Sequence, residues 1–307
     1  MADVAVVIGN YQGEAVLRDC LASLEMQTLR PTEVIVVDAS STDGSAQIAA
    51  SNGATFMKRK NVGLGHLYNE GARAARAEFV LLANNDVAFD EHCLELLVDA
   101  LEEDEDRFAA DPRQLSWDGG SLVHARAEIR RGPLLRQVLP GYRIDLTVPA
   151  EGTVATLCAN GGAMLVRRTR MLELGGFDET FFMDFEDIDL CWRAWLRGWP
   201  SVYVADAFVR HRVGAVTTAA ILPTRVRSSH HNLLRFALKC FPATDAARVV
   251  LGELARLPAH PLLIAPALLR VARELPEIIK LRREIEPGRD FMHWALAGMP
   301  PTSQRTT

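Results

Sequence analysis

Two carboxylates in the N-terminal part of the chain directly follow apolar segments and are suited to bind a charged ligand. Asp38 comes after the apolar residues 33–37, and Asp86 closes the triplet Asn84-Asn85-Asp86 after residues 79–83. A carboxylate at the first position can accept hydrogen bonds from a base or a ribose. Asp86, the charged member of the triplet, can help to hold Mg²⁺ or Mn²⁺, which prefers one or two carboxylates together with substrate phosphates. A plain polar turn is the alternative at both positions.

Two further acidic residues, Glu186 and Asp187, are candidates for a general base. They follow the aromatic-rich residues 181–185 and open a segment, residues 187–197, that is predicted to be helical. Large apolar neighbours can raise the pKa of a carboxyl group and make it a better base. The alternative is that acids in a first helical turn only interact favourably with the helix dipole.

Small polar motifs flank the predicted start of another helix. They are Asn61-Val62-Gly63 and Asn69-Glu70-Gly71. Glycine permits close backbone approach or a positive φ, and a helix N-terminus can face an anion. Loop and packing glycines are the alternative explanation of both motifs.

The histidines differ in what their positions suggest. His211 follows a predicted strand at residues 202–204 and could complete a metal site, because neutral imidazole is a common ligand. A structural histidine is the alternative. His230 and His231 have no useful partner spacing, and we interpret them as surface or helix residues.

The first third of the chain predicts the elements that must position these side chains. Apolar strands are expected at residues 4–8, 33–37, 54–57 and 79–83, alternating with helices at 14–27, 45–50, 65–76 and 90–101. This rhythm predicts a parallel sheet covered by helices on both faces. Ligands bind beyond the carboxyl ends of such strands, and Asp38 and Asp86 both lie at that edge.

The rest of the chain is less regular. Residues 102–150 predict a long irregular or partly helical excursion, followed by strands at 153–158, 163–166 and 201–204. From about residue 223 onward the chain is rich in leucine and arginine, is punctuated by proline and is expected to be helical. We expect a catalytic domain at 1–222, with halves 1–101 and 151–222, and a helical segment at 223–307.

Composition excludes several classes of protein. The net charge of −5 over 307 residues argues against a broad nucleic-acid surface. Five cysteines without a CxxC pair suggest neither a zinc site nor a disulfide framework, which fits a reducing cytoplasm. Asp3 and the short apolar run after it argue against a signal peptide, and no run of about 18 apolar residues predicts a membrane span. We therefore expect a cytoplasmic protein.

Taken in order, these motifs resemble those of the family 2 glycosyltransferases, particularly the rhamnosyltransferase-like branch. The resemblance extends over residues 4–211 and is carried by residues 4–11, 34–45, 61–63, 69–71, 84–86, 161–164, 176–179 and 185–190. Two departures are visible. Residues 9–12 read Gly-Asn-Tyr-Gln where the family usually has Pro-Thr-Tyr-Asn or Val-Asn-Tyr-Asn, and the triplet at 84–86 has a single aspartate.

The resemblance implies a GT-A fold, a Rossmann-like and mostly parallel sheet flanked by helices, with a helical C-terminal extension. It implies an inverting single displacement in which Asp187 is the base, with Glu186 beside it. Asp38 would read the nucleobase, Asp86 would lie by the metal and diphosphate, and His211 would approach them. Gly161 and Gly162 would line the acceptor side. The residues that would contact the nucleotide sugar are Asn10, Tyr11, Asp38, Ser40, Asn61, Gly63, Asn69, Asn84, Asn85 and Asp86.

The resemblance also suggests the ligands. A divalent cation, Mg²⁺ or Mn²⁺, is the expected cofactor. The first choice of donor is dTDP-rhamnose and the second is a UDP-sugar; the acceptor would be a saccharide or lipid-linked saccharide in polysaccharide or glycan biosynthesis. The alternatives are a sugar nucleotidyltransferase, which would need a basic residue in the loop after the first strand, and a non-catalytic nucleotide-sugar-binding protein.

The sequence of the C-terminal segment suggests where the protein would bind its acceptor. Leucines at 262, 263, 268 and 269 alternate with basic residues at 270, 273, 280, 282 and 283. A basic amphipathic helix can lie on an anionic membrane surface, here the inner face of the membrane, where a lipid-linked acceptor would be reached. A helix packed on the catalytic domain, or on a second subunit of a homo-oligomer, is the alternative.

Overall fold

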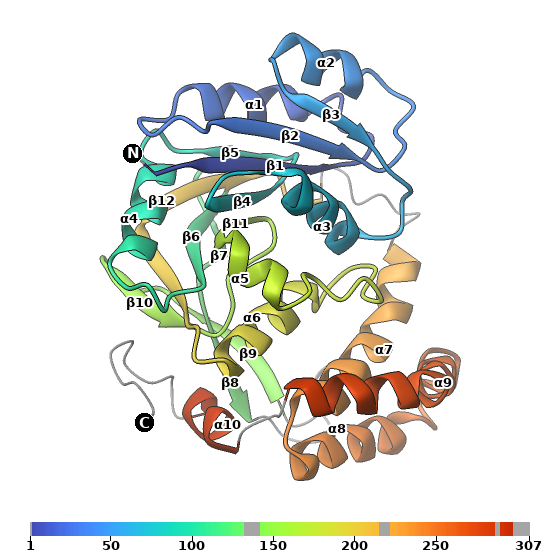
Figure 1. Cartoon of the computed structure of the whole chain (residues 1–307). Helices are drawn as coiled ribbons and strands as arrows, with labels where there is room; N and C mark the ends of the chain where they lie inside the picture. Colours follow the sequence, from blue (N-terminus) through green and yellow to red (C-terminus); the bar gives the residue numbers. More distant parts are fainter. Residues whose placement is uncertain (1, 132–141, 215–221, 286–288, 297–307) are drawn as a thin grey trace.

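The computed structural model describes residues 2–131, 142–214, 222–285 and 289–296 (Figure 1). Its central feature is a mixed sheet in the order β10-β12-β6-β11-β4-β1-β2-β3, to which β5 and β7 add at the side. The N-terminal half supplies four mutually parallel strands, in the order β4-β1-β2-β3. They are β1 (Val4–Asn10), β2 (Glu33–Asp38), β3 (Thr55–Lys58) and β4 (Phe79–Asn84).

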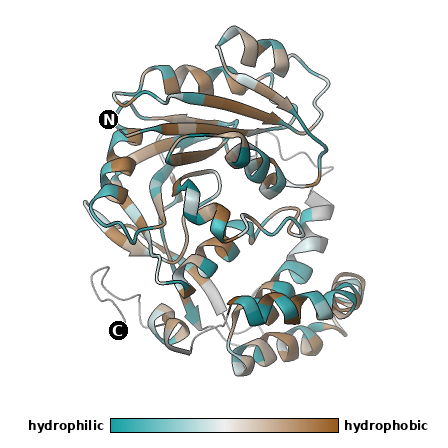
Figure 2. Ribbon diagram, in the orientation of Figure 1, coloured by the Kyte–Doolittle hydropathy of each residue, from teal (hydrophilic) through white to brown (hydrophobic). Residues whose placement is uncertain are grey.

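Helices cover both faces of these strands, which explains their continuous apolar sequences. Residues of β1 alternate between two hydrophobic clusters, with Val4, Val6 and Ile8 in one and Ala5 and Val7 in the other. The helices are α1 (Leu17–Glu25), α2 (Ser45–Ser51), α3 (Leu64–Ala74) and α4 (Cys93–Glu102). Figure 2 shows the hydrophobic strands lying in the interior between helices with hydrophilic outer faces.

The second half of the sheet is formed by later strands. Antiparallel β11 (Ala163–Arg167) joins β4, while β6 (Ala109–Ser116) and the long β12 (Ser201–His211) pair in parallel beyond it. The other strands are β5 (Val87–Phe89), β7 (Leu122–His124), β8 (Arg126–Arg131), β9 (Tyr142–Thr147) and β10 (Thr153–Thr156). Two helices follow β11, namely α5 (Arg168–Glu173) and α6 (Glu186–Leu196).

For the described part of residues 102–150, the prediction of an irregular or partly helical excursion is wrong, because β6 to β9 lie there; residues 132–141 lie outside the described residues. Strand β6 carries a buried Asp111 that an apolar-pattern search rejects. The structure satisfies its carboxylate with His124 at 2.8 Å and the backbone N–H of Asn160 at 3.1 Å. Pro112 lies opposite Val204, next to a shift in the register with β12, where a missing N–H is tolerated.

The predicted helical C-terminal segment is present as four helices in its described part. They are α7 (Leu222–Cys240), α8 (Ala243–Arg256), α9 (Pro261–Ile285) and α10 (Arg289–Leu296). His230 and His231, interpreted as surface or helix residues, do lie in helix α7, but a position at the surface is wrong because both side chains are buried. Their ring nitrogens lie 2.6 Å from Glu253 of α8 and 2.8 Å from Glu274 of α9. Among the described residues, no helix has the length and apolar character needed to span a membrane.

Candidate active site

A cavity of about 170 Å³ opens at the carboxyl ends of β1, β2 and β4. Parallel pairing brings these ends together, with Asn10 opposite Asp38 and Gly9 opposite Asn84. Its lining comprises Gly9, Asn10, Tyr11, Ala39, Asn61, Gly63, Leu64, Leu67, Asn84, Asn85, Asp86, Phe182 and Met183. The structure thus assembles seven of the predicted donor-contacting residues around one cavity, and leaves Asp38, Ser40 and Asn69 outside its lining.

Asp38 lies behind the cavity rather than in its wall. Its fully buried carboxylate accepts hydrogen bonds from the side chain of Asn10 at 2.6 Å and from the backbone N–H and hydroxyl of Ser41 at 2.7 and 2.6 Å. The Oδ1 atom of Asn10 in turn accepts a hydrogen bond from Asn85 at 2.7 Å. A buried charge must be satisfied by such donors. Asp38 therefore fixes the orientation of two amides that do line the cavity.

Asn69 and Ser40 also have internal partners. The Asn69 side chain is buried, donates to the carbonyl of Phe177 at 3.0 Å and to Glu179 at 2.9 Å, and accepts from the N–H of Phe177 at 2.8 Å. The Ser40 hydroxyl donates to the carbonyl of Arg59 at 2.8 Å. These contacts anchor the loops on either side of the cavity.

Gly63 is required by the shape of the cavity wall. Its φ is 124°, a conformation that side chains with a Cβ rarely adopt. A Cβ atom at this position would lie 2.9 Å from the carbonyl oxygen of Phe182. The loop carrying Asn61 and Gly63 can therefore approach the backbone before α6 only because residue 63 is glycine.

Tyr68 of α3 connects the triplet to Gly161, one of the two glycines predicted to line the acceptor side. Its hydroxyl lies 2.6 Å from the carbonyl oxygen of Gly161 and 3.0 Å from Oδ1 of Asn84. Burial, together with the nearby Glu186 carboxylate, raises the pKa of Tyr68 well above its usual value, so the hydroxyl stays neutral. The backbone N–H of Asn84 also donates to the carbonyl of Gly162 at 2.9 Å.

Asp86 and His211 meet at the floor of the site, where Nε2 of His211 lies 3.1 Å from Oδ1 of Asp86. Hydrogen bonds behind the ring indicate which nitrogen carries a proton. Asn160 Oδ1 accepts from the N–H of Gly162 at 2.9 Å and from the amide of Gln114 at 3.0 Å. The carbonyl oxygen of Gln114 therefore faces Nδ1 of His211, at 2.9 Å, and Nδ1 carries the proton.

This arrangement fits a divalent cation. With the Nδ1 proton donated to Gln114, a neutral ring would direct the lone pair of Nε2 toward a carboxylate oxygen of Asp86, and two lone pairs at that separation would favour a cation between them. One carboxylate and one imidazole leave positions for substrate phosphates, as Mg²⁺ and Mn²⁺ prefer. Among the described residues, no group of three or more His, Cys, Asp or Glu side chains gathers as a metal cluster. Donor phosphates would thus have to complete the ligand set.

The two candidate bases begin α6, across Gly161 from Tyr68. The Oδ2 atom of Asp187 accepts a hydrogen bond from the N–H of Gly161 at 3.1 Å, and Oδ1 accepts from the N–H of Ile188 at 2.8 Å. Desolvation by the surrounding protein raises the pKa of Asp187. A raised pKa makes a carboxylate a stronger proton acceptor.

Glu186 is the more buried of the two, with 7% of its surface exposed. Within the described residues, its Oε2 atom has no hydrogen-bond partner. Burial, followed by the adjacent Asp187 charge, raises the pKa of Glu186. A buried carboxyl without a partner is costly when ionised, which favours a neutral Glu186 beside an ionised Asp187.

Three residues that sequence reasoning missed support this site, namely Tyr68, Gln114 and Asn160. Most of their contacts join residues far apart in sequence, up to 97 positions in the pair formed by Gln114 and His211, whereas the contact of Asn160 with Gly162 is local. No local spacing signals such contacts. The one available hint is that the polar Asn160 directly precedes Gly161-Gly162, between the strands predicted at 153–158 and 163–166.

The chain is similar in sequence to known glycosyltransferases. Residues 5–159 match the sequence profile described as Glycosyl transferase family 2. The N-acetylglucosaminyl-diphospho-decaprenol L-rhamnosyltransferase of Mycobacterium tuberculosis is similar to this chain, at 32% identity over 237 residues, which are 69% of this chain and 76% of the relative. Rhamnosyltransferase WbbL of Escherichia coli is 30% identical over 150 residues, which are 47% of this chain and 55% of WbbL.

Solved structures share the fold at low sequence identity. GalNAc-T7 with UDP, GalNAc and Mn²⁺ has a TM-score of 0.63 at 16% identity, covering 79% of this chain and 49% of GalNAc-T7. This chain thus spans about half of that protein. TarS 1–349 of S. aureus in complex with UDP has a TM-score of 0.52 at 17% identity, covering 80% of this chain and 68% of TarS.

The raised pKa of Glu186 predicts a pH-dependent stability difference. A carboxyl with a folded-state pKa above its ordinary 4.5 stabilises the fold below that value, and the stabilisation is lost as pH rises through the folded-state pKa. Glu186→Gln stays neutral, so its stability relative to the wild type should rise between about pH 5 and pH 9. For each tenfold difference in proton affinity of Glu186 between the folded and unfolded protein, the free energy of unfolding of Glu186→Gln should gain about 1.4 kcal/mol relative to the wild type. Urea unfolding of the wild type and the variant at both pH values measures this difference in free energy of unfolding.

The exposed Glu102 of α4 provides the control, since Glu102→Gln should show no such pH-dependent gain. An equal effect of Glu186→Gln at both pH values would show that Glu186 has an ordinary pKa in the folded protein.

Proposed function

Because the chain belongs to glycosyl transferase family 2, we propose that it is an inverting glycosyltransferase that moves a sugar from a nucleotide-diphosphate donor to a lipid-linked saccharide. The observation that carries this proposal is the position of Asp187, whose carboxylate is linked through the peptide of Gly161 and the hydroxyl of Tyr68 to Asn84 in the wall of the cavity. The rhamnosyltransferase relatives support dTDP-rhamnose as the first donor, with UDP-sugars as the second. The name of the mycobacterial relative supports a polyprenyl-diphosphate-linked acceptor.

The residues around the cavity suggest how the donor is held. Tyr11 and Asn10 would contact the base and ribose, with Asp38 holding Asn10 in place from behind. Asp86 and His211 would hold a divalent ion against the diphosphate, where the ion would supply Lewis-acid stabilisation of the leaving group. Gln114 keeps the Nε2 lone pair of His211 available for that ion.

The proposed chemical step is a single displacement. The acceptor oxygen forms a bond to the anomeric carbon as the bond from that carbon to the diphosphate oxygen breaks. The nucleoside diphosphate leaves with the bonding electrons. The hydroxyl proton passes to Asp187, whose raised pKa suits it to accept that proton. The anomeric configuration inverts because attack comes from the face opposite the leaving group.

Replacing the base tests this assignment. Asp187→Asn keeps the size and one of the two hydrogen-bond acceptors, which can still serve the N–H of Gly161, but it cannot accept the acceptor proton. We expect kcat for sugar transfer to fall by about 10²- to 10⁴-fold, the usual contribution of a general base, with near-native stability. Asp99→Asn, an exposed aspartate of α4, is the matched control and should retain the wild-type rate. A folded Asp187→Asn protein with full transfer rate would remove Asp187 from the mechanism.

Ligand-induced stabilisation tests the donor and metal sites together. We expect dTDP-rhamnose or a UDP-sugar to raise Tm, by the equivalent of about 2.7 kcal/mol at a hundredfold excess over Kd. Mn²⁺ should add to this shift in the wild type, since Asp86 and His211 would bind it with the diphosphate. Asp86→Ala should keep the nucleotide shift and lose the Mn²⁺ increment. If Asp86→Ala kept the whole increment, the metal would have to lie elsewhere.

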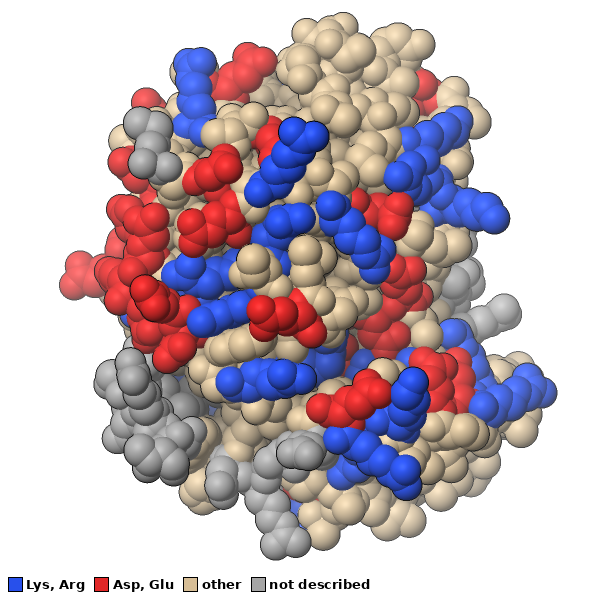
Figure 3. All heavy atoms as spheres, viewed as in Figure 1, with Lys and Arg blue, Asp and Glu red and all other residues tan. Residues whose placement is uncertain are grey.

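The helical segment supplies a surface suited to a lipid-linked acceptor. Large apolar side chains are exposed on α8 and α9, including Leu251 at 62%, Leu262 at 85% and Leu269 at 60%. Exposed basic residues of α9, Arg273 and Lys280 among them, accompany these leucines. Figure 3 shows Lys and Arg side chains interspersed with Asp and Glu over the lower part of the molecule, where these helices lie. We propose that this surface contacts an anionic membrane, since apolar burial and lipid charge act together in such binding.

Flotation with phosphatidylglycerol vesicles at low salt tests membrane contact. The wild type should float with the vesicles and dissociate as salt rises, because the basic residues contribute through screened attraction. The double variant Leu262→Ser/Leu269→Ser should lose most of this binding. Met26→Ser is the matched control, since Met26 is 68% exposed but lies beside α1 on the catalytic domain. Wild-type protein that stays unbound, or equal binding by all three, would contradict the proposal.

A further inference from the structure

The two residues before the candidate bases have a backbone conformation that other contacts must maintain. Asp184 has φ 66° and Phe185 has φ 76°, both in the left-handed region although neither is glycine. Non-glycine residues rarely adopt this region, and two in succession are rarer still. Phe185 is also the N-cap of α6, so its conformation sets the direction in which Glu186 and Asp187 leave the turn.

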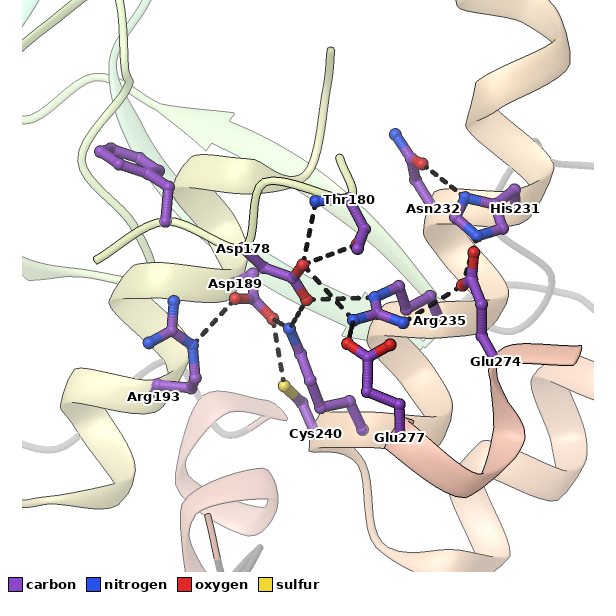
Figure 4. Close-up of polar contacts among 12 residues, drawn as sticks. Asp178, Thr180, Asp189, Arg193, His231, Asn232, Arg235, Cys240, Glu274 and Glu277 are labelled. Carbon is purple, nitrogen blue, oxygen red and sulfur yellow. Dashed lines mark hydrogen bonds and ion pairs between the residues drawn. The ribbon is translucent and has the colours of Figure 1, made fainter. Parts of the chain in front are cut away.

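Helix α7 supplies the contacts that hold this turn. The buried Asn232 donates from its side-chain amide to the carbonyl of Met183 at 2.8 Å and to the carbonyl of Asp184 at 2.9 Å. These carbonyls lie on either side of the first left-handed residue. Asn232 Oδ1 faces Nδ1 of His231 at 3.0 Å, and this contact directs the NH₂ group toward the turn (Figure 4).

Arg225 binds the side chain of the same turn. Its Nε and Nη2 atoms each lie 2.8 Å from a different carboxylate oxygen of Asp184. This two-point geometry restrains Asp184 more strongly than a single-point ion pair would. The ring of Phe185 packs against Phe236 of α7, with centroids 5.7 Å apart. Both left-handed residues are thus held by the same helix.

A second group of contacts ties α7 to the first turn of α6 itself. Lys239 lies 2.5 Å from Asp178 and 2.6 Å from Asp189, the residue two positions after Asp187. Arg193 of α6 also binds Asp189, at 2.9 Å. With the turn held at one end and Asp189 at the other, the backbone of Glu186 and Asp187 is restrained on both sides by α7.

We propose that Asn232 and Arg225 of α7 are positioning residues for the base: they hold the left-handed turn at Asp184 and Phe185 and so direct Asp187 toward the acceptor hydroxyl. This inference rests on the role proposed above for Asp187. It also assigns the helical segment a part in sugar transfer that is separate from membrane contact, because Asn232 and Arg225 face the site rather than the exposed leucines of α8 and α9.

A double-mutant cycle distinguishes positioning of the base from general loss of structure. Asn232→Ala and Arg225→Ala should each lower kcat by about tenfold to a hundredfold, as expected when a reacting group is displaced by about 1 Å. In the Asp187→Asn background, each should lower the residual kcat by less than about twofold, since no base remains to be positioned. Arg225→Lys, which keeps the charge but loses the two-point geometry, should be intermediate.

Arg248→Ala is the matched control for Arg225→Ala. Arg248 also forms an ion pair with an aspartate in the helical segment, and its side chain is 48% exposed against 47% for Arg225. It should leave kcat unchanged. Unchanged kcat in Asn232→Ala and Arg225→Ala, or equal losses in the presence and absence of Asp187, would overturn the positioning role.

Hydrogen exchange supplies a readout that does not need catalysis. Amides of residues 183–189 should exchange faster in Asn232→Ala and Arg225→Ala than in the wild type or Arg248→Ala, because the turn loses its restraints. Unchanged exchange there would contradict the proposal even if activity fell. If Asp187→Asn retained full activity, the proposed function would fail, and exchange alone would still decide whether α7 holds the turn.

Discussion

The peptide groups of Gly161 and Gly162 are the point at which the two halves of the candidate site depend on each other. The Gly161 N–H donates to Asp187 and its carbonyl accepts from Tyr68, while the Gly162 carbonyl accepts from Asn84 and its N–H donates to Asn160. A Cβ atom at Gly162 would lie 2.8 Å from Oδ1 of Asn160. Backbone groups therefore join the triplet, the base and the support behind His211, and a side chain at Gly162 would crowd Asn160, His211 and Asn84.

The resemblance to family 2 glycosyltransferases and the GT-A fold class are both confirmed. Sequence reasoning succeeded for the parallel strands because burial on both faces makes their sequences continuously apolar, and it succeeded for the cavity because parallel strand ends must meet at one edge. It failed for β6, whose Asp111 and Pro112 are tolerated only because His124 and a register shift lie next to them in space. Apolar patterns cannot detect a strand that is stabilised by partners distant in sequence.

The same limit applies to single residues of the site. The motif order drew attention to Asp38 and Asn69, but it could not distinguish a residue that touches a ligand from one that holds its neighbour. In the structure, internal partners engage both side chains. His230 and His231 illustrate the opposite error, because their carboxylate partners lie on other helices, at Glu253 and Glu274. Buried polar residues of this kind are visible only once the helices are packed.

The account depends most on the claim that Asp187 activates an acceptor hydroxyl for one direct displacement. The measurement closest to that claim is the anomeric configuration of the transferred sugar, determined by NMR on purified product from a donor of known configuration. Single displacement predicts the configuration opposite to that of the donor. A product with the donor's configuration would contradict the account, because a single direct displacement at the anomeric carbon inverts the configuration of that carbon.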